Sequence, residues 1–343
     1  MRVIDPESLP GTPRRRDLLR GSAALGALAG LGLSRVARGA GEARALKLGH
    51  IFSRDSQLGA GAAEFARSFE AATGGAWQIE TYPNGVLGGE VEMLDALRKG
   101  ELDLAFVTTG PLASFAPDFG VFDLPFVFRD ALQARAILDG PVGAAYLERF
   151  RGGDLVALAW GENGMRHLTN ARRPVRTPDD LRGLRLRVPQ SDVTLRCFRQ
   201  LGVDAAPLGF PALYGALESG RFDGQENPIA TIRSARFERV QRYLTLTGHV
   251  YSGAVFFMSQ DIWDTLNGAE QAASVEAARA GGLASRLAAG EGEREGVDRL
   301  RAAGMDVVLN VDRADFLAAL EPAWSDLAGH FGKSRIACLR ALP

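Results

Sequence analysis

The sequence predicts an α/β fold, because short strand-like segments alternate with amphipathic helical segments along most of its length. Apolar runs such as 102–107 have the length and composition of strands, whereas Phe65 and Phe69 lie one helical turn apart. Glycine pairs such as Gly74-Gly75 mark helix ends. With 343 residues, the chain has room for two domains of ordinary size.

The individual elements follow from the same signals, taken in chain order. Strands are predicted at 45–51, 77–82, 102–107, 154–160, 184–188 and 221–225. Helices are predicted at 58–72, 89–99, 192–201 and 211–219. A further helix begins at Thr177-Pro178, since proline suits the first helical position. Residues 268–301 are rich in alanine and predict either one long helix or two helices that meet at Gly281-Gly282.

Two short segments correspond to each other within the chain. Residues 94–103 and 214–223 share the pattern of a helix end, a capping glycine and an apolar residue followed by aspartate. Chance is one explanation; the other is that each of two lobes holds the same helix-to-strand unit. In that case Thr108 and Thr109 lie at a strand end equivalent to the one near Asn227. Ligands of open α/β sheets sit beyond the carboxyl ends of strands, so these residues would face one cleft from opposite walls.

Two arginines and an asparagine stand out as candidate ligand contacts. Arg187 lies near the end of the predicted strand 184–188, which Pro189 stops, and Arg166 follows a glycine-rich turn after a buried strand. Asn227 lies at the end of the run from Asp223 to Pro228, just before its proline. A guanidinium fork matches a carboxylate in a bidentate way, and an amide can donate or accept. The alternative for each arginine is a structural ion pair. Asp223 and Glu226 are interpreted as residues that cap a helix or hold the turn at Gly224.

The composition excludes several other functions. The formal net charge is -1, so nothing indicates a nucleic acid or an anionic membrane as partner. Cys197 falls on an apolar helical stripe, which favours a buried thiol over a disulfide to Cys338. The four histidines show no ligand spacing, so no metal site is predicted. No Gly-x-Ser-x-Gly or His-Glu-x-x-His motif is present, so no catalytic residue is assigned.

Residues 1–45 predict an export signal and its cleavage region. Basic residues at 14–16 precede an apolar run at 23–33 that is too short for a usual membrane span. Arg15-Arg16 followed by Asp-Leu-Leu is typical of twin-arginine signals, and an ordinary Sec signal is the alternative. Small-residue sites place the start of the mature chain between about 40 and 46. Either route leads to the periplasm.

Ordered sequence blocks extend over most of the chain. They lie at 82–89, 123–128, 164–170, 178–189, 223–228 and 243–249. With these blocks, the chain from about residue 46 to 335 resembles the DctP-type substrate-binding proteins of tripartite ATP-independent periplasmic (TRAP) transporters. The resemblance implies a two-lobed periplasmic binding-protein fold (type II-like) with crossover strands and a long spanning helix, for which the tract 268–301 is suitable.

The resemblance also implies lobe boundaries and site residues. Lobe I would comprise 46–163 and about 250–285, and lobe II 164–249 and about 286–335. Arg187 would be the main carboxylate clamp, Arg166 a second anion contact and Asn227 a hydrogen-bond partner of the acid. The remaining implied pocket residues are Gln190, Phe210, Thr108 and Thr109. One departure is at 210–214, where the family commonly has Phe-x-Glu-x-Tyr and this chain lacks the acid.

The function that the resemblance implies is that of a receptor. It would bind a small organic acid and deliver it to the membrane permease subunits of a TRAP transporter, without a cofactor or metal and as a monomer. Uronates, sugar acids, C4-dicarboxylates, 2-oxo acids and aromatic acids all suit the same clamp, and two arginines favour a dicarboxylate or a hydroxy acid. The alternatives are a periplasmic enzyme acting on organic acids and a sensory receptor.

Overall fold

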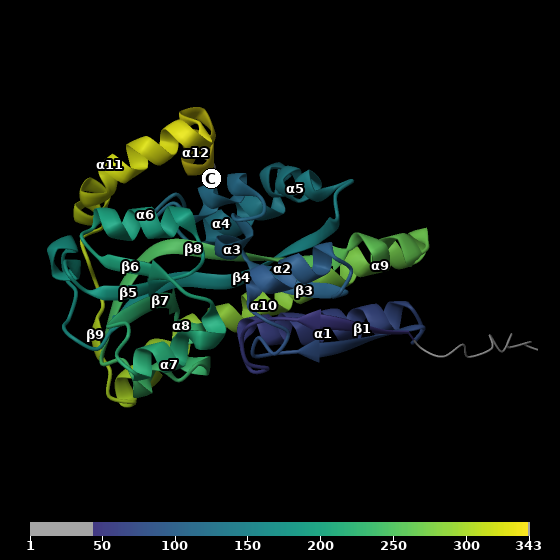
Figure 1. Cartoon of the computed structure of the whole chain (residues 1–343), viewed down its shortest axis with the longest axis horizontal. Helices are drawn as coiled ribbons and strands as arrows, with labels where there is room; N and C mark the ends of the chain where they lie inside the picture. Colours follow the sequence, from purple (N-terminus) through teal and green to yellow (C-terminus); the bar gives the residue numbers. More distant parts are fainter. Residues whose placement is uncertain (1–43, 342–343) are drawn as a thin grey trace, which may run out of the picture. The chain divides into compact units, whose positions relative to one another are not determined.

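The computed structural model describes residues 44–341 (Figure 1). The predicted export signal therefore lies almost wholly outside the described residues. Within 44–341, no helix is both long and apolar enough to cross a membrane. The strands are β1 (Arg44–Gly49), β2 (Trp77–Tyr82), β3 (Leu104–Thr108), β4 (Leu155–Asn170), β5 (Arg185–Val188), β6 (Asp204–Pro207), β7 (Gly224–Pro228), β8 (Tyr243–Ser259) and β9 (Asp306–Val308).

Helices connect and cover these strands. The α-helices are α1 (Gln57–Ala72), α2 (Glu90–Arg98), α3 (Thr109–Leu112), α4 (Ala131–Asp139), α5 (Pro141–Leu147), α6 (Asp192–Gln200), α7 (Leu213–Glu218), α8 (Ile229–Ser234), α9 (Gln260–Thr265), α10 (Gly268–Ala302), α11 (Arg313–Phe331) and α12 (Lys333–Ala341). Short 3₁₀ helices are η1 (Pro117–Asp123), η2 (Glu148–Phe150), η3 (Pro178–Leu181), η4 (Phe210–Ala212) and η5 (Phe237–Arg239).

The strands form one mixed sheet in the order β2-β1-β3-β8-β4-β7-β5-β6, and β9 pairs with β8. At one side β1 is parallel to both β2 and β3, and at the other side β5 is parallel to both β6 and β7. The long strands β4 and β8 pair with each other in antiparallel fashion between these blocks. Because β3 is antiparallel to β8 and β7 is antiparallel to β4, the two parallel blocks run in opposite directions.

This arrangement makes the carboxyl ends of the two blocks face each other. β3 ends at Thr108, which pairs with Ala254 of β8, and Ala254 in turn pairs with Gly161 of β4. β7 ends at Pro228, which pairs with Arg166 of β4. At about 3.3 Å per residue, the two strand ends are roughly 16 Å apart along β4. The space beyond the strand ends is the expected place for a ligand in such a sheet.

The sequence located most elements, and its main error concerned β4. The prediction for 77–82 matches β2, whereas β4 continues ten residues past the predicted end at 160, to Asn170. The prediction that Arg166 follows a turn was therefore wrong, because this residue lies inside the strand. The glycines there belong to bulges instead: the register with β8 shifts between Glu162 and Gly164, and Gly164 has φ 129°.

The tract 268–301 forms the single helix α10, without a break at Gly281-Gly282. α10 packs against α1, β4 and α8, and so runs past both parallel blocks (Figure 1). A Cβ atom at Gly281 would lie 2.6 Å from the Gly61 carbonyl oxygen, and one at Gly282 would lie 2.1 Å from the Trp160 carbonyl oxygen. These glycines therefore allow a close approach of the helix rather than a bend.

Buried aromatic side chains form much of the core between α1 and the sheet. The rings of Phe106 and Phe256 stack with a centroid distance of 3.8 Å, and Phe65 stacks on Phe256 at 5.3 Å. A second cluster, which includes Ile229 and Phe237, lies beside α7 and α8. These two clusters hold helices against both parallel blocks of the sheet. The division into lobes at the predicted boundaries stays a prediction.

Gly282→Ala should destabilise the fold. The added Cβ would press on the β4 backbone, and overpacking of this kind costs about 1–3 kcal/mol. Gly290→Ala in the same helix is the matched control, since its nearest neighbour would be a side-chain nitrogen of Arg294 at 3.5 Å. That control should be unchanged or more stable by up to about 1 kcal/mol. Urea unfolding of both variants tests this, and equal stability of Gly282→Ala and the wild type would contradict it.

Candidate ligand-binding site

Several charged side chains are buried at the facing strand ends. Arg166 of β4, Arg187 of β5 and Glu226 of β7 are 6%, 4% and 0% exposed, and Glu90 of α2 and Asp123 of η1 are 6% and 3% exposed. Burial of a charge is costly unless hydrogen bonds or an opposite charge compensate it. The partners of each side chain therefore indicate which charges are structural and which remain available for a ligand.

Arg166 and Glu226 form a buried ion pair. The Arg166 Nη2 atom donates to Glu226 Oε1 at 2.7 Å and to the Glu226 carbonyl oxygen at 2.6 Å, and Nε donates to Oε2. Burial opposes the charge of Glu226, but Arg166 and a contact with His249 outweigh it and lower the pKa of Glu226 to about 2. The predicted role of Glu226 in a cap or turn was therefore wrong.

Only one guanidinium nitrogen of Arg166, Nη1, has no hydrogen-bond partner among residues 44–341. Burial works against the charge of Arg166, yet Glu226 and then Asp123 raise its pKa above the ordinary value. The alternative interpretation of Arg166 as a structural ion pair thus describes most of what this side chain does. Its capacity for a second anion contact is limited to that one nitrogen.

Arg187 differs from Arg166 in having no carboxylate partner within the described chain. Its Nε atom donates to the Leu208 carbonyl oxygen at 2.7 Å, and no hydrogen bond is formed by Nη1 or Nη2. Both nitrogens keep some solvent-accessible surface, so both border accessible space. Burial and then Arg166 lower the pKa of Arg187 to about 10, which leaves the side chain charged at neutral pH. Arg187 therefore presents a charged fork with two free donors.

Glu90 is a further buried carboxylate of this cluster. It is the first residue of α2, and its Oε1 accepts from the Thr108 backbone N–H at 2.6 Å. The side chain of Thr108 also hydrogen-bonds this carboxylate. Burial raises the pKa of Glu90 to about 7, although Thr108 and both Arg187 and Arg166 lower it. The charge of Glu90 in turn raises the pKa of Arg187, so the two groups lie in one electrostatic cluster.

Sequence reasoning missed Glu90. It follows directly on the block 82–89, but an acidic residue in the first turn of a helix is ordinarily explained by the helix dipole. Burial of that carboxylate depends on the meeting of α2 with β3, which local sequence does not reveal.

Asp123 connects segments that follow the two facing blocks. It accepts from Thr109 Oγ1 at 3.2 Å, after β3, and from Ser191 Oγ at 2.8 Å, after β5. Burial raises the pKa of Asp123 to about 6, against the effect of Ser191 and Arg166. Both carboxylate oxygens of Asp123 thus have partners. The Thr109 hydroxyl is already committed to this contact.

The other predicted residues occupy different surroundings. Asn227 Nδ2 donates to Gln225 Oε1 at 2.5 Å, and its Oδ1 has no partner in the described chain. Thr108 is buried at the end of β3, and its backbone N–H and its side chain both hydrogen-bond Glu90. Gln190 lines a surface pocket between α6 and the end of α11 and makes no hydrogen bond to Arg187.

Loops from the two sides touch across the cluster. The Phe52 ring, after β1, meets the Phe210 ring of η4 edge to face with a centroid distance of 4.5 Å. A Cβ atom at Gly85, in the loop after β2, would lie 2.6 Å from Cγ of Pro211. The loops after β1 and β2 therefore meet the segment that contains η4.

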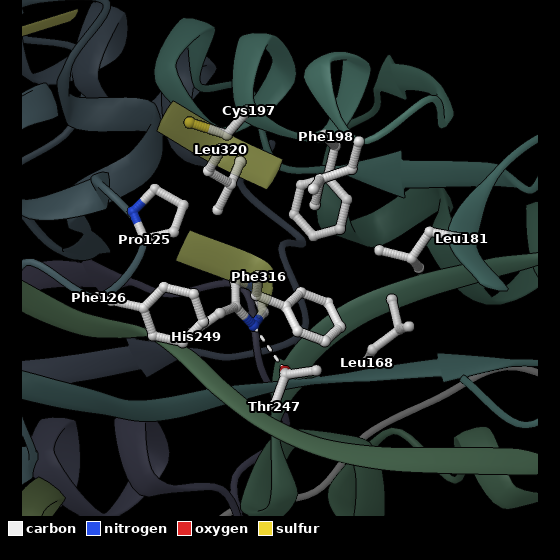
Figure 2. Close-up of a pocket in the computed structure, with 11 residues that line it drawn as sticks. Pro125, Phe126, Leu168, Leu181, Cys197, Phe198, Thr247, His249, Phe316 and Leu320 are labelled. Carbon is white, nitrogen blue, oxygen red and sulfur yellow. Dashed lines mark hydrogen bonds between the residues drawn. The ribbon is translucent and has the colours of Figure 1, made fainter. Parts of the chain in front are cut away.

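An apolar pocket is lined by residues that include His249, Phe198 and Phe316 (Figure 2). His249 enters it, with Nδ1 2.8 Å from Thr247 Oγ1 and Nε2 3.2 Å from Glu226 Oε2. Burial lowers the pKa of His249, so the imidazole is neutral at pH 7. Cys197 also lines the pocket as a free thiol whose pKa burial raises to about 12, which confirms the predicted buried thiol. The lining of this apolar pocket includes neither Arg166 nor Arg187, so the pocket is not the anion site.

Glu226→Gln should destabilise the fold strongly. It leaves the Arg166 charge buried without its partner, and breaking a buried ion pair from one side typically costs about 3–5 kcal/mol. Asp179→Asn, which removes an exposed ion pair with Arg182, should cost less than about 1 kcal/mol. The free energy of unfolding in urea measures both. Similar values for the two variants would show that the buried pair is not structural.

The stability of the wild type should fall as the pH rises from 4.5 to about 7. In that range Glu90 keeps its proton in the folded chain and loses it in the unfolded chain, a difference on the order of 3 kcal/mol. Glu226 acts in a separate window, because its stabilising charge is lost only as the pH falls below 4.5 toward about 2.

Glu90→Gln removes the first of these effects. The free energy of unfolding of this variant relative to the wild type should therefore increase between about pH 5 and about pH 8. Glu92→Gln, at an exposed position of the same helix, is the control and should follow the wild type. A pH profile of Glu90→Gln parallel to that of the wild type would contradict the assignment.

Comparison with known proteins places the chain in a family. The family model for bacterial extracellular solute-binding proteins, family 7 (DctP), matches residues 48–330. A solute-binding protein of Verminephrobacter eiseniae is 42% identical over 289 residues, which cover 84% of this chain and 86% of the relative.

Solved structures of TRAP periplasmic solute-binding proteins share the fold. One from Polaromonas sp. JS666, bound to D-erythronate, superposes with a TM-score of 0.86 at 39% identity and covers 87% of this chain and 99% of that chain. The sugar acid binding protein DctPAm of Advenella mimigardefordensis, in complex with galactonate, has a TM-score of 0.84 at 34% identity and covers 87% and 96%. The chain therefore belongs to family 7 of the bacterial extracellular solute-binding proteins, the DctP family, and is a TRAP-type solute-binding protein with a two-lobed α/β fold rather than an enzyme.

Proposed function

We propose that this chain binds a small organic acid through Arg187 and delivers it to a TRAP-type membrane permease. The free fork of Arg187 is the observation that carries the proposal, because Nη1 and Nη2 form a charged pair of donors that border accessible space. A ligand carboxylate matches this fork in a bidentate way. The D-erythronate and galactonate named for two similar structures each carry one carboxylate, which supports an acid as ligand here.

The remaining predicted contacts have graded roles in this proposal. Arg166 adds one donor, Nη1, because Glu226 holds its other nitrogens. Asn227 offers its free Oδ1, and Thr108 offers its hydroxyl, which also hydrogen-bonds Glu90. Thr109 acts indirectly through Asp123, and Phe210 closes one side against Phe52. Gln190 keeps its predicted role as a pocket residue, although in this structure it lines a separate surface pocket beside α6.

Lobe closure is the second part of the proposal. We assign 46–163 with about 250–285 to lobe I and 164–249 with about 286–335 to lobe II, so that β4 and β8 carry the hinge. The β4 register shift between Glu162 and Gly164 lies at this boundary and supports the assignment. A ligand that bridges the two strand ends contacts both lobes only in the closed form, and so favours that form.

The family is periplasmic, and the finer steps of export and delivery are proposals. Arg15-Arg16 supports the twin-arginine route for the predicted signal at 1–45. We propose that the exported chain is a monomer that presents the closed, loaded form to the permease.

Arg187→Ala should abolish the binding of acids without unfolding the chain. Ligands are first identified with a thermal-shift panel of uronates, sugar acids, dicarboxylates and 2-oxo acids, because a bound ligand raises the apparent stability. Two charge-assisted hydrogen bonds, at roughly 1.5–3 kcal/mol each, correspond to a loss of at least about 100-fold in affinity. Calorimetry measures the loss.

Arg199→Ala, at an exposed position of α6, is the matched control and should bind as the wild type does. Wild-type affinity in Arg187→Ala would overturn the assignment of Arg187 as the clamp. If no acid of the panel raises the apparent melting temperature of the wild type, the result contradicts an organic acid as ligand.

A further inference from the structure

We infer that the site takes up a proton from solvent when it binds an organic acid, and that the carboxylate of Glu90 receives this proton. The affinity for the acid then depends on pH in a range where the acid itself stays ionised. This inference rests on the proposed function, in which Arg187 holds the carboxylate of the ligand.

The buried charges of the site are unbalanced before any acid binds. Two guanidiniums share one electrostatic cluster with three carboxylates, because each of these groups acts on the pKa of at least one other. The groups are Arg166, Arg187, Glu90, Asp123 and Glu226. A bound acid adds a fourth carboxylate, and a like charge nearby favours the neutral form of an acid. Uptake of one proton returns the site to the net charge that it had before binding.

The hydrogen-bond partners decide which carboxylate can accept the proton. Glu226 is held by the guanidinium of Arg166, which can only donate, so a proton on Glu226 would disrupt this pair. Glu90 is held by the backbone N–H of Thr108, at 2.6 Å, and by the Thr108 side chain. Because a hydroxyl donates to a carboxylate but can accept from a carboxylic acid, Glu90 keeps both hydrogen bonds when it becomes neutral.

Asp123 is also held by two hydroxyl groups, and the position of the ligand distinguishes it from Glu90. Arg187, the proposed clamp, acts on the pKa of Glu90, and Glu90 acts on that of Arg187. The charged groups that act most strongly on Asp123 are Arg166 and Glu226 instead. Burial raises the pKa of Glu90 to about 7 and that of Asp123 to about 6, so Glu90 is the first of the two to take up a proton as the pH falls.

The elements around α2 bring few other titratable groups close to Glu90. This helix packs against β3, α3 and β8, and neither β3 nor α3 holds a titratable residue. The titratable residues of β8 are Tyr243, His249 and Tyr251. None of these three is among the groups with the largest effects on the pKa of Glu90, which include Arg187 and Arg166. Both arginines stay charged near neutral pH, so a pH effect there is assigned to a carboxylate.

The proton and the acid strengthen each other's binding by the same factor, because coupling between two bound species is reciprocal. The affinity for the acid should be nearly constant below about pH 6, where Glu90 is protonated with and without ligand. It should fall as the pH rises above about 7, by about 10-fold if binding raises the pKa of Glu90 by about one unit. The ligand carboxyl group, with an ordinary pKa of about 4, does not titrate in this range.

Calorimetry tests the inference with the acids bound in four similar structures, which are D-erythronate, galactonate, succinate and D-glucuronate. Titrations near pH 7.5 in HEPES and in Tris, which differ in ionisation enthalpy, give the number of protons taken up. With an acid that binds, the wild type should take up at least about 0.5 proton per site, because Glu90 is mostly ionised before binding and mostly protonated afterwards. The affinity should fall about 10-fold between about pH 6 and about pH 8.5.

Glu90→Gln should bind without proton uptake, and its affinity should no longer depend on pH in this range. Glu92→Gln, exposed on the same helix, is the matched control and should take up as many protons as the wild type. If Glu90→Gln does not fold or bind, carbon NMR of the Glu90 carboxyl group in the wild type replaces it. The titration midpoint of that group should then rise when the acid saturates the site.

Three results would overturn the inference and leave acid binding through Arg187 intact. They are binding by the wild type without proton uptake, wild-type uptake in Glu90→Gln, and an unchanged titration midpoint of Glu90 on saturation. If none of the four acids binds to the wild type, the proposed function itself fails, and the inference fails with it.

Discussion

The buried ion pair between Arg166 and Glu226 is the interaction on which the rest of the site depends. It joins β4 to β7 at the point where β7 ends, and neutralises two charges that the fold otherwise could not bury. Two of the three guanidinium nitrogens of Arg166 donate hydrogen bonds to Glu226. The positive charge that remains available in the site is therefore mainly that of Arg187. Under the proposed function, a ligand is thus recognised mainly by the Arg187 guanidinium, while the Arg166 guanidinium holds β4 and β7 together.

The ion pair has this position because of the sheet topology. The parallel blocks run in opposite directions on either side of β4 and β8, so their carboxyl ends meet over the middle of these long strands. Helix α10 supports that middle from behind, where Gly281 and Gly282 allow its backbone to approach Gly61 and Trp160. The same region thus combines a closely packed helix with long strands whose register is shifted by bulges.

The sequence predicted those parts of the fold and site that local signals determine. Strand 77–82 and the Arg187 position before Pro189 followed from alternation and a strand stop. Arg166 was misplaced, because glycines that create bulges in a long strand resemble those of a turn. Glu90 was missed because its burial and the effect of Arg187 on its pKa both depend on segments that are far apart in sequence. Local sequence patterns therefore do not predict side-chain partners that tertiary packing brings together. The ion pair between Arg166 and Glu226 is another example.

The unpaired charge of Arg187 connects ligand binding to stability. Arg187 is buried without a carboxylate partner in the described chain, so its charge reduces the stability of the ligand-free protein. Under the proposed function, the carboxylate of a bound acid provides the missing anion and compensates this cost. The ligand then stabilises the conformation in which it contacts Arg187, so the charge that recognises the acid also makes that conformation dependent on the acid.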